Sequence, residues 1–375
     1  MKTKAVLLAA VVLTLPALAD EGFVELFNGR DLSGWTNVNC APETWTWSDG
    51  AVHCTGIPTG ALRTLRQYEN FILELEWRHL KSGGNSGVFI WASPIAAPGV
   101  PFLRAIEVQV LDHGYGKSDW FTTHGDVFPI HGSTMKPFGR HNGMRSFPSE
   151  ERSKGTPEWN HYRITGSNGV LRLAVNGKEV SGGEDCVWRK GYLGLESEGS
   201  PTEFRNVRIK ELPSTGATAD ESAPSDQSWQ SLYNGLDLRG WTTSGPGTNR
   251  WQARDWTLVN QGGATPGQAL SSLRNFGDCE LIWDARVAEK GGVTVPSGLR
   301  LRGAELPAAF AAASAPTDKW QRYKLTVKGR EATLQVGDAA PIKATLPESR
   351  PASGPVGLVD TGTPMEFANF YVREL

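Results

Sequence analysis

The chain has 375 residues and carries 38 Lys and Arg against 40 Asp and Glu, which gives a formal net charge of −2. With no basic stripe or polybasic tail, this balance argues against a nucleic-acid partner. The 43 Gly, 23 Pro and 14 Trp, and the absence of long helical periodicity, indicate short strands joined by turns.

The N-terminal residues have the layout of a secretory signal peptide. Lys2 and Lys4 precede an apolar run over 5–18, which ends in small residues suited to cleavage. This run is shorter than the roughly 20 apolar residues that span a bilayer, so we expect no membrane span once the signal is removed. We therefore predict a signal peptide over 1–19 and an exported protein, either periplasmic or secreted.

A nine-residue motif occurs twice in the chain. Residues 27–35 (FNGRDLSGW) return at 233–241 (YNGLDLRGW), an offset of 206, whereas the C-terminal matches have an offset of 163. The second copy therefore lacks about 43 residues of the first, between its Trp283 and Trp320. We predict two diverged copies of one domain, over 20–212 and 228–375, joined by a linker over 213–227.

Alternating apolar residues predict antiparallel strands in both copies. Residues 71–77 and 170–175 alternate in the first copy, as do 323–327 and 332–336 in the second. Turn pairs such as Asn176-Gly177 are typical of tight hairpins. We predict an all-β fold with two stacked sheets in each copy.

Four cysteines are few for an exported protein, so we expect that disulfides do not build this fold. Cys40 and Cys54 flank a predicted hairpin, so they either pair or remain buried thiols. Cys186 and Cys279 lie in different copies.

The histidines are concentrated in the first copy. All seven lie between His53 and His161, and four of them fall in the segment that the second copy lacks: His113, His124, His131 and His141. An extra polar segment on a shared frame is where function is expected. The alternative is a long surface loop with scattered polar residues.

A strand predicted over 105–111 carries two polar side chains on one face. Alternation directs its apolar residues to the core and Glu107 and Gln109 to the opposite face, with Asp112 out of phase unless a bulge realigns it. A solvated outer face is the alternative explanation. Because a loop rich in His and Asp follows, we predict acid–base chemistry here. The predicted catalytic residues are Glu107, Asp112, His113 and His124.

A Gly-rich turn over 82–87 carries Asn85, whose amide can both donate to and accept from a sugar hydroxyl. An ordinary hairpin turn is the alternative. The second copy has Pro296 in place of Asn85 and no counterpart of Glu107 or Gln109. The predicted substrate-binding residues are Asn85, Gln109, Trp91 and Asp126. The pairs Asp112/His113 and His124/Asp126 are compatible with a divalent metal ion, although their spacing defines no metal site.

In combination, these motifs resemble the 3-keto-disaccharide hydrolase domain family. The resemblance covers 23–212 and is carried by 27–35, 84–88 (GNSGV), 107–112 (EVQVLD), 159–160 and 204–207 (FRNV). The second half, 229–375, looks like a degenerate member. The resemblance implies tandem concanavalin A-like jelly-roll sandwiches, with a glycan site on a concave sheet. Other members carry Gln and His near the turn that here reads GLESEG, over 194–199.

The resemblance also implies cleavage of 3-oxo-glycosides. A ketone at C3 acidifies the hydrogen on C2, so a base removes it while an acid protonates the departing O1, and water then adds to the enone. We expect Glu107 and His113 or His124 to transfer protons and Asp112 to orient or ligate. Gln109 and Asn85 are expected to bind hydroxyls.

Two other functions are consistent with the sequence. A non-catalytic, lectin-like protein would stack sugars on Trp91, Trp120 and Phe121, although most tryptophans are expected in the core. An ordinary glycosidase would use Glu107 and Asp112 as its pair of carboxyl groups. All three functions require a carbohydrate partner.

Overall fold

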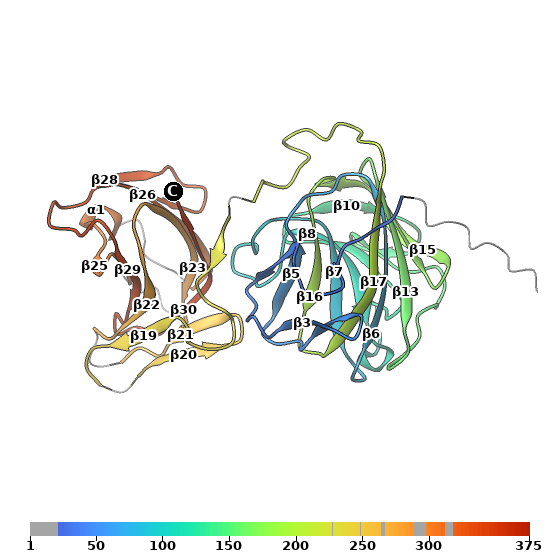
Figure 1. Cartoon of the computed structure of the whole chain (residues 1–375), viewed down its shortest axis with the longest axis horizontal. Helices are drawn as coiled ribbons and strands as arrows, with labels where there is room; N and C mark the ends of the chain where they lie inside the picture. Colours follow the sequence, from blue (N-terminus) through green and yellow to red (C-terminus); the bar gives the residue numbers. More distant parts are fainter. Residues whose placement is uncertain (1–21, 227, 248, 264–266, 289–297, 312–317) are drawn as a thin grey trace, which may run out of the picture.

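The computed structural model describes residues 22–226, 228–247, 249–263, 267–288, 298–311 and 318–375. The predicted signal peptide lies outside these residues. Figure 1 shows two β-sandwiches side by side, with the connecting segment passing along one edge. Within the described residues, no helix is long and apolar enough to cross a membrane.

The first sandwich consists of two antiparallel sheets, here named sheets I and II. Sheet I has the order β10 (Thr134–Pro137), β15 (Lys178–Val187), β14 (Val170–Val175), β13 (Asn160–Ser167), β6 (Phe71–His79), β17 (Thr202–Glu211), β4 (Ala51–Cys54) and β3 (Trp45–Ser48), with β1 (Val24–Glu25) on β17. Sheet II has the order β11 (His141–Asn142), β12 (Arg145–Ser146), β9 (Val127–Ile130), β8 (Ala105–Leu111), β7 (Asn85–Ala92), β16 (Tyr192–Ser197), β5 (Gly60–Thr64) and β2 (Trp35–Val38). A short 3₁₀ helix, η1 (His113–Tyr115), follows β8.

The second sandwich has two sheets of its own, here named sheets III and IV. Sheet III has the order β20 (Trp251–Arg254), β21 (Thr257–Asn260), β30 (Met365–Glu374), β23 (Cys279–Val287), β26 (Gln321–Lys328), β27 (Glu331–Val336) and β28 (Ile342–Thr345), with β18 (Gln230–Ser231) on β30. Sheet IV has the order β19 (Trp241–Ser244), β22 (Ala269–Phe276), β29 (Gly354–Val359), β24 (Leu299–Leu301) and β25 (Ala304–Glu305). The helix α1 (Ala308–Ala311) has a single turn.

The strand order of the second sandwich repeats that of the first. The strands of sheet III, from β20 to β28, correspond in order to those of sheet I from β3 to β15. The strands of sheet IV, from β19 to β25, correspond in order to those of sheet II from β2 to β8. Strands β9 to β12 have no counterpart in the described part of the second sandwich. They come from the segment that the sequence comparison shows to be missing there. The prediction of an all-β chain with two sandwiches is confirmed.

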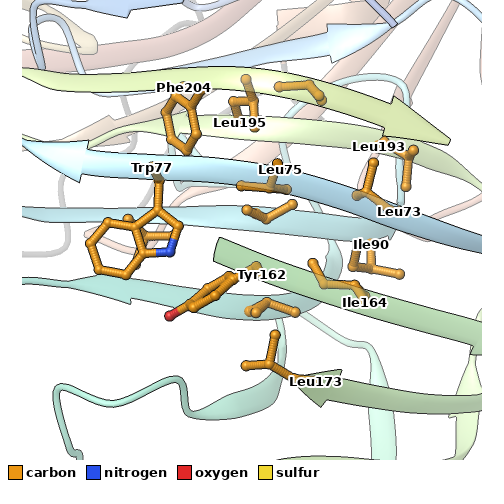
Figure 2. Packing of buried hydrophobic residues seen from close by; sticks show 14 of the residues in the cluster. Leu73, Leu75, Trp77, Ile90, Tyr162, Ile164, Leu173, Leu193, Leu195 and Phe204 are labelled. Atoms are coloured by element: carbon orange, nitrogen blue, oxygen red, sulfur yellow. The ribbon is translucent and has the colours of Figure 1, made fainter. Parts of the chain in front are cut away.

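Each sandwich buries its own core between its two sheets. In the first, apolar side chains from alternate positions of β6, β13 and β16 interdigitate around Trp77 and Tyr162, whose rings meet edge to face with centroids 5.3 Å apart (Figure 2). Burial of large apolar surface of this kind is the main stabilising contribution to such a fold.

The repeated nine-residue motif has a structural role. In the first copy Trp35 Nε1 donates to Leu26 O at 2.8 Å, and in the second Trp241 Nε1 donates to Leu232 O at the same distance. Each hydrogen bond satisfies the N–H group of a buried indole. The motif therefore fixes the position of the first residues of each sandwich. The cysteines take no part in cross-linking: Cys40 and Cys54 are buried free thiols.

A third apolar cluster joins the two sandwiches. It combines one face of sheet II, the segment between β7 and β8, and two residues of sheet III. Its buried members are Val38, Ala61, Phe89, Ala92, Ala96, Leu103, Ala105, Tyr192, Ile282 and Tyr371. The two sandwiches therefore share a small core of their own.

Candidate active site

The two faces of sheet II have different surroundings. On β8, Ile106, Val108 and Val110 belong to the sandwich core. Glu107 and Gln109 lie on the opposite face and are each only 6% exposed. Buried polar groups require partners, and these two find them on the neighbouring strands.

Two glutamates converge above a glycine of β7. The register pairs Leu195 with Val88, which places Glu196 of β16 beside Gly87. A Cβ atom on Gly87 would lie 2.8 Å from Glu107 Oε1 and 3.0 Å from Glu196 Oε2. Only glycine therefore leaves room for both carboxyl groups at this point.

A third glutamate lies at the half-buried end of the cluster. Asn85 Nδ2 donates to Glu198 Oε2, and Gln109 Nε2 donates to Asn85 Oδ1 at 2.8 Å and to Ser86 O at 3.1 Å. These hydrogen bonds connect β8, β7 and the end of β16. They fix the orientation of both amides predicted to bind substrate.

An arginine from β12 completes the cluster. Arg145 Nη1 lies 3.0 Å from Asp126 Oδ2 and 3.4 Å from Gln109 Oε1. Its guanidinium covers the ring of Phe128, 3.4 Å from the centroid. Asp126 is fully buried and also accepts from Thr122, so it supports Arg145 rather than facing a ligand. We refer to Asn85, Glu107, Gln109, Arg145, Glu196 and Glu198 as the glutamate cluster.

The carboxyl groups of the cluster hold their protons unusually tightly. Burial, together with the charge of Glu198, raises the pKa of Glu107 to about 8, although Arg145 opposes the shift. Burial and the charges of Glu107 and Glu198 raise the pKa of Glu196 well above its ordinary value. Burial also raises the pKa of Glu198, but hydrogen bonds from Glu196 and Asn85 counteract it. The pKa values of all three neighbouring carboxyl groups are therefore raised, and strongly shifted carboxyl groups in a cluster are typical of functional sites.

Glu196 has one further unusual feature. Its Oε2 atom is buried and has no hydrogen-bond partner within the described ranges. Unsatisfied buried oxygens are rare in folded proteins and call for an explanation. A ligand that donates to this oxygen would satisfy it, and protonation of Glu196 would remove the charge that makes an unpartnered position most costly.

Asp112 lies apart from the cluster and supports a loop. Its carboxylate accepts from Gly83 N, Gly114 N and both Thr156 N and Thr156 Oγ1, all at 2.7–2.8 Å. Burial would raise the pKa of Asp112, but these hydrogen bonds outweigh it and hold the pKa well below its ordinary value. Since its oxygens are occupied, the placement does not favour the catalytic role predicted for Asp112.

His113 and His124 lie together but outside the glutamate cluster. Their rings are 4.8 Å apart, and both bond to Ser153 Oγ, at 2.9 and 2.8 Å. His124 also borders a cavity of about 510 Å³, lined in part by Glu151. No contact described in this structure joins either ring to Glu107.

The pairs considered as metal ligands do not assemble into a site. Among the residues that the structure describes, no group of three or more His, Cys, Asp or Glu is placed to hold a metal ion. His124 and Asp126 belong to one loop, yet Asp126 is engaged by Arg145.

The prediction that Trp91 binds substrate is wrong. Its φ is +53°, and the pairing of β16 with β7 shifts register between Tyr192 and Gly194, so a bulge turns the indole into the core. There Trp91 is 1% exposed, donates to Glu69 O and packs on Phe71. Strict alternation would have placed it beside Phe89, on the face of the cluster.

Glu196, Glu198 and Arg145 are functional candidates that were not predicted from the sequence. A signal for the glutamates was present: at the C-terminal offset of 163, the second copy has Val359 and Thr361 at their positions. Both of these carboxyl groups are thus absent from the second copy. The expectation that Glu107 has no counterpart is wrong, because the strand register places Glu305 of β25 at its position, where the side chain is exposed and lies 3.7 Å from Arg300. The position corresponding to Asn85, Pro296, lies outside the described residues.

Comparison with known proteins identifies relatives of the first sandwich. A family model described as a 3-keto-alpha-glucoside-1,2-lyase-like domain matches residues 22–210. A 3-keto-disaccharide hydrolase from Bacteroides thetaiotaomicron is 26% identical over 241 residues, which cover 53% of this chain and 81% of the relative. The residues that the family model matches, 22–210, contain the whole glutamate cluster.

Solved structures similar to this chain also cover about half of it. A protein from Parabacteroides distasonis, proposed to be a glycosyl hydrolase, is 22% identical with a TM-score of 0.40, covering 52% of this chain and 95% of its own. A carbohydrate-binding module from Bacillus subtilis is 15% identical with a TM-score of 0.35, covering 48% and 96%.

Proposed function

Because this chain belongs to the family of 3-keto-alpha-glucoside-1,2-lyase-like domains, we propose that it cleaves 3-oxo-glycosides by elimination followed by hydration. The glutamate cluster carries the proposal, since it places Glu107, a buried carboxyl group whose pKa is raised to about 8, on the same face as the more exposed Glu198, which accepts a hydrogen bond from Asn85. The name of the Bacteroides relative, a 3-keto-disaccharide hydrolase, supports the substrate class.

The elimination step uses two glutamates in different protonation states. Glu198, the most exposed of the three, removes the proton from C2, and the electron pair of that bond forms the C1=C2 double bond. The C1–O1 bond breaks as Glu107 gives its proton to O1, which releases the aglycone as an alcohol. The sugar remains as an enone with its ketone at C3.

Hydration restores both glutamates. Water adds to C1 and gives a proton to Glu107, while Glu198 returns its proton to C2. Arg145 of β12 is placed to stabilise the charge that develops on the C3 oxygen, because its guanidinium reaches Gln109 on the strand that carries Glu107. The product is the free 3-oxo sugar.

Turnover of a 4-nitrophenyl 3-oxo-glucoside, measured beside its unoxidised parent, tests the proposal. We expect release only from the oxidised sugar, with deuterium from solvent incorporated at C2. Glu107→Gln should lower kcat by roughly 10²–10⁴-fold because it cannot donate a proton. Glu76→Gln is the matched control, since Glu76 pairs with Arg205 on sheet I. Release from the unoxidised parent would support an ordinary glycosidase, and glycan binding without release a lectin.

We further propose that the protein is exported and that its halves are diverged copies of one domain, over 20–212 and 228–375. The N-terminal pattern supports export. The repeated motif and the matching strand orders support the duplication.

A further inference from the structure

The second sandwich rests on the same face of sheet II that carries the glutamate cluster. Phe89 of this face is the direct strand partner of Glu107 and is completely buried. It belongs to the cluster that Ile282 and Tyr371 of sheet III complete. The interface between the sandwiches therefore begins one residue pair from the proposed acid.

A segment between β7 and β8, residues 93–104, lies between the two sandwiches. It folds back on itself through a bridge between Ala96 and Leu103. Leu103 is fully buried, and a Cβ atom on Gly194 would lie 3.5 Å from Leu103 Cδ1 and 3.1 Å from Phe89 Cδ2. The segment thus covers the part of the face next to Glu107.

The second sandwich holds this segment through its backbone. Gly99 N donates to Asp284 Oδ2 at 2.8 Å, and Arg322 Nη2 donates to Ala96 O at 2.9 Å. Asn369 Nδ2 lies 3.1 Å from Ala97 O and 2.9 Å from the carbonyl of Val100. Side chains that bond backbone groups fix the path of a segment whatever its sequence.

Asp284 is at the centre of this arrangement. Its side chain is fully buried, and it accepts from Arg322 Nε at 2.8 Å and from Asn369 Nδ2 at 2.6 Å as well as from Gly99. A buried carboxylate is tolerated only when it is fully partnered. Because one of its partners belongs to the first sandwich, the arrangement is complete only in the docked state.

We propose that Asp284, Arg322 and Asn369 are positioning residues for the glutamate cluster: they fix segment 93–104 as one wall of the substrate site, so the second sandwich is a working part of the catalytic unit. This inference rests on the proposed function. A fixed wall excludes water from Glu107, and low water content is what keeps a carboxylic acid protonated near neutral pH.

The test compares two isosteric variants of the full chain. Asp284→Asn removes one charged acceptor from the interface. Asp360→Asn removes a carboxylate that is equally buried in the second sandwich but pairs with Arg250, away from the first. Two properties are measured for each: hydrogen exchange of the amides of 93–104, and the pH profile of kcat/KM on the 3-oxo-glucoside.

We expect faster exchange in 93–104 for Asp284→Asn only, with kcat/KM lowered about 10–100-fold. The alkaline limb of the profile, which reports the ionisation of the acid, should move down by at least about one pH unit. Asn369→Ala should change the exchange rates, kcat/KM and the alkaline limb in the same direction. It keeps the inference testable if Asp284→Asn fails to fold. Equal exchange and equal profiles in both variants would overturn the inference. If the wild type turns over no 3-oxo-glucoside, the proposed function fails. The exchange rates alone then decide whether Asp284 fixes the segment 93–104.

Discussion

At the scale of single residues, Glu107 and Glu198 are the same type of acid, and only their surroundings make their proposed roles differ. Glu107 lies under a covered part of sheet II with a hydrophobic partner, Phe89, beside it. Glu198 lies at the half-buried end of β16, where Asn85 donates to it. Desolvation favours the neutral acid and hydrogen bonds to the anion favour ionisation, which would allow one residue type to supply both proposed roles.

The raised pKa of Glu107 predicts how stability depends on pH. Folding raises this pKa from 4.5 to about 8, so the folded state binds the proton more tightly than the unfolded state. The resulting stabilisation is complete below about pH 4.5 and is lost as the pH rises to about 8. Between about pH 5 and pH 8, we expect the free energy of unfolding of the wild type to fall by at least ~1 kcal/mol relative to Glu107→Gln. Urea titrations of both proteins at the two pH values measure this difference, and parallel pH profiles would contradict it.

At the scale of elements, the alternation of apolar residues was sufficient to predict the strands and the face on which Glu107 and Gln109 lie. Alternation failed at Trp91, because a bulge is invisible in a periodic pattern and reverses the face of the residues beyond it. It also said nothing about which strands are neighbours. The importance of β16, and hence of Glu196, emerges only when β16 is placed beside β7.

The glycine of β7 provides a test of this arrangement that removes no reactive group. In Gly87→Ala, the added methyl group would lie within 3.0 Å of both Glu107 and Glu196 and would push the carboxyl groups apart. We expect kcat to fall by roughly 10-fold or more with the fold retained, because the clash is with side-chain ends. Gly277→Ala is the matched control, since its nearest neighbour would be Ala352 O at 3.8 Å. Equal activity of the two variants would show that the convergence over Gly87 is unimportant.

At the scale of the whole molecule, the repeat predicted two sandwiches but not how they meet. The groups at the interface look unremarkable in the sequence: Asn39, Asp284 and Asn369 are isolated polar residues near or within strands. Their role depends on a long-range encounter, in which Asn39 Nδ2 donates to Asn369 Oδ1 at 2.7 Å across the two sandwiches. No pattern within one element carries this information.

The interface between the two sandwiches has a buried centre and an exposed rim. Removing an arginine from the centre should therefore lower the free energy of unfolding more than removing one from the rim. Arg322→Ala leaves the fully buried Asp284 without its charged partner, so we expect the free energy of unfolding to fall by ~3–5 kcal/mol. Arg239→Ala removes an ion pair with Glu43 in which both side chains are about half exposed, and should cost less than ~1 kcal/mol. Urea unfolding followed by Trp fluorescence compares the two variants. Similar losses would mean that the sandwiches are held together by their apolar contacts, with Asp284 and Arg322 contributing no more than the rim.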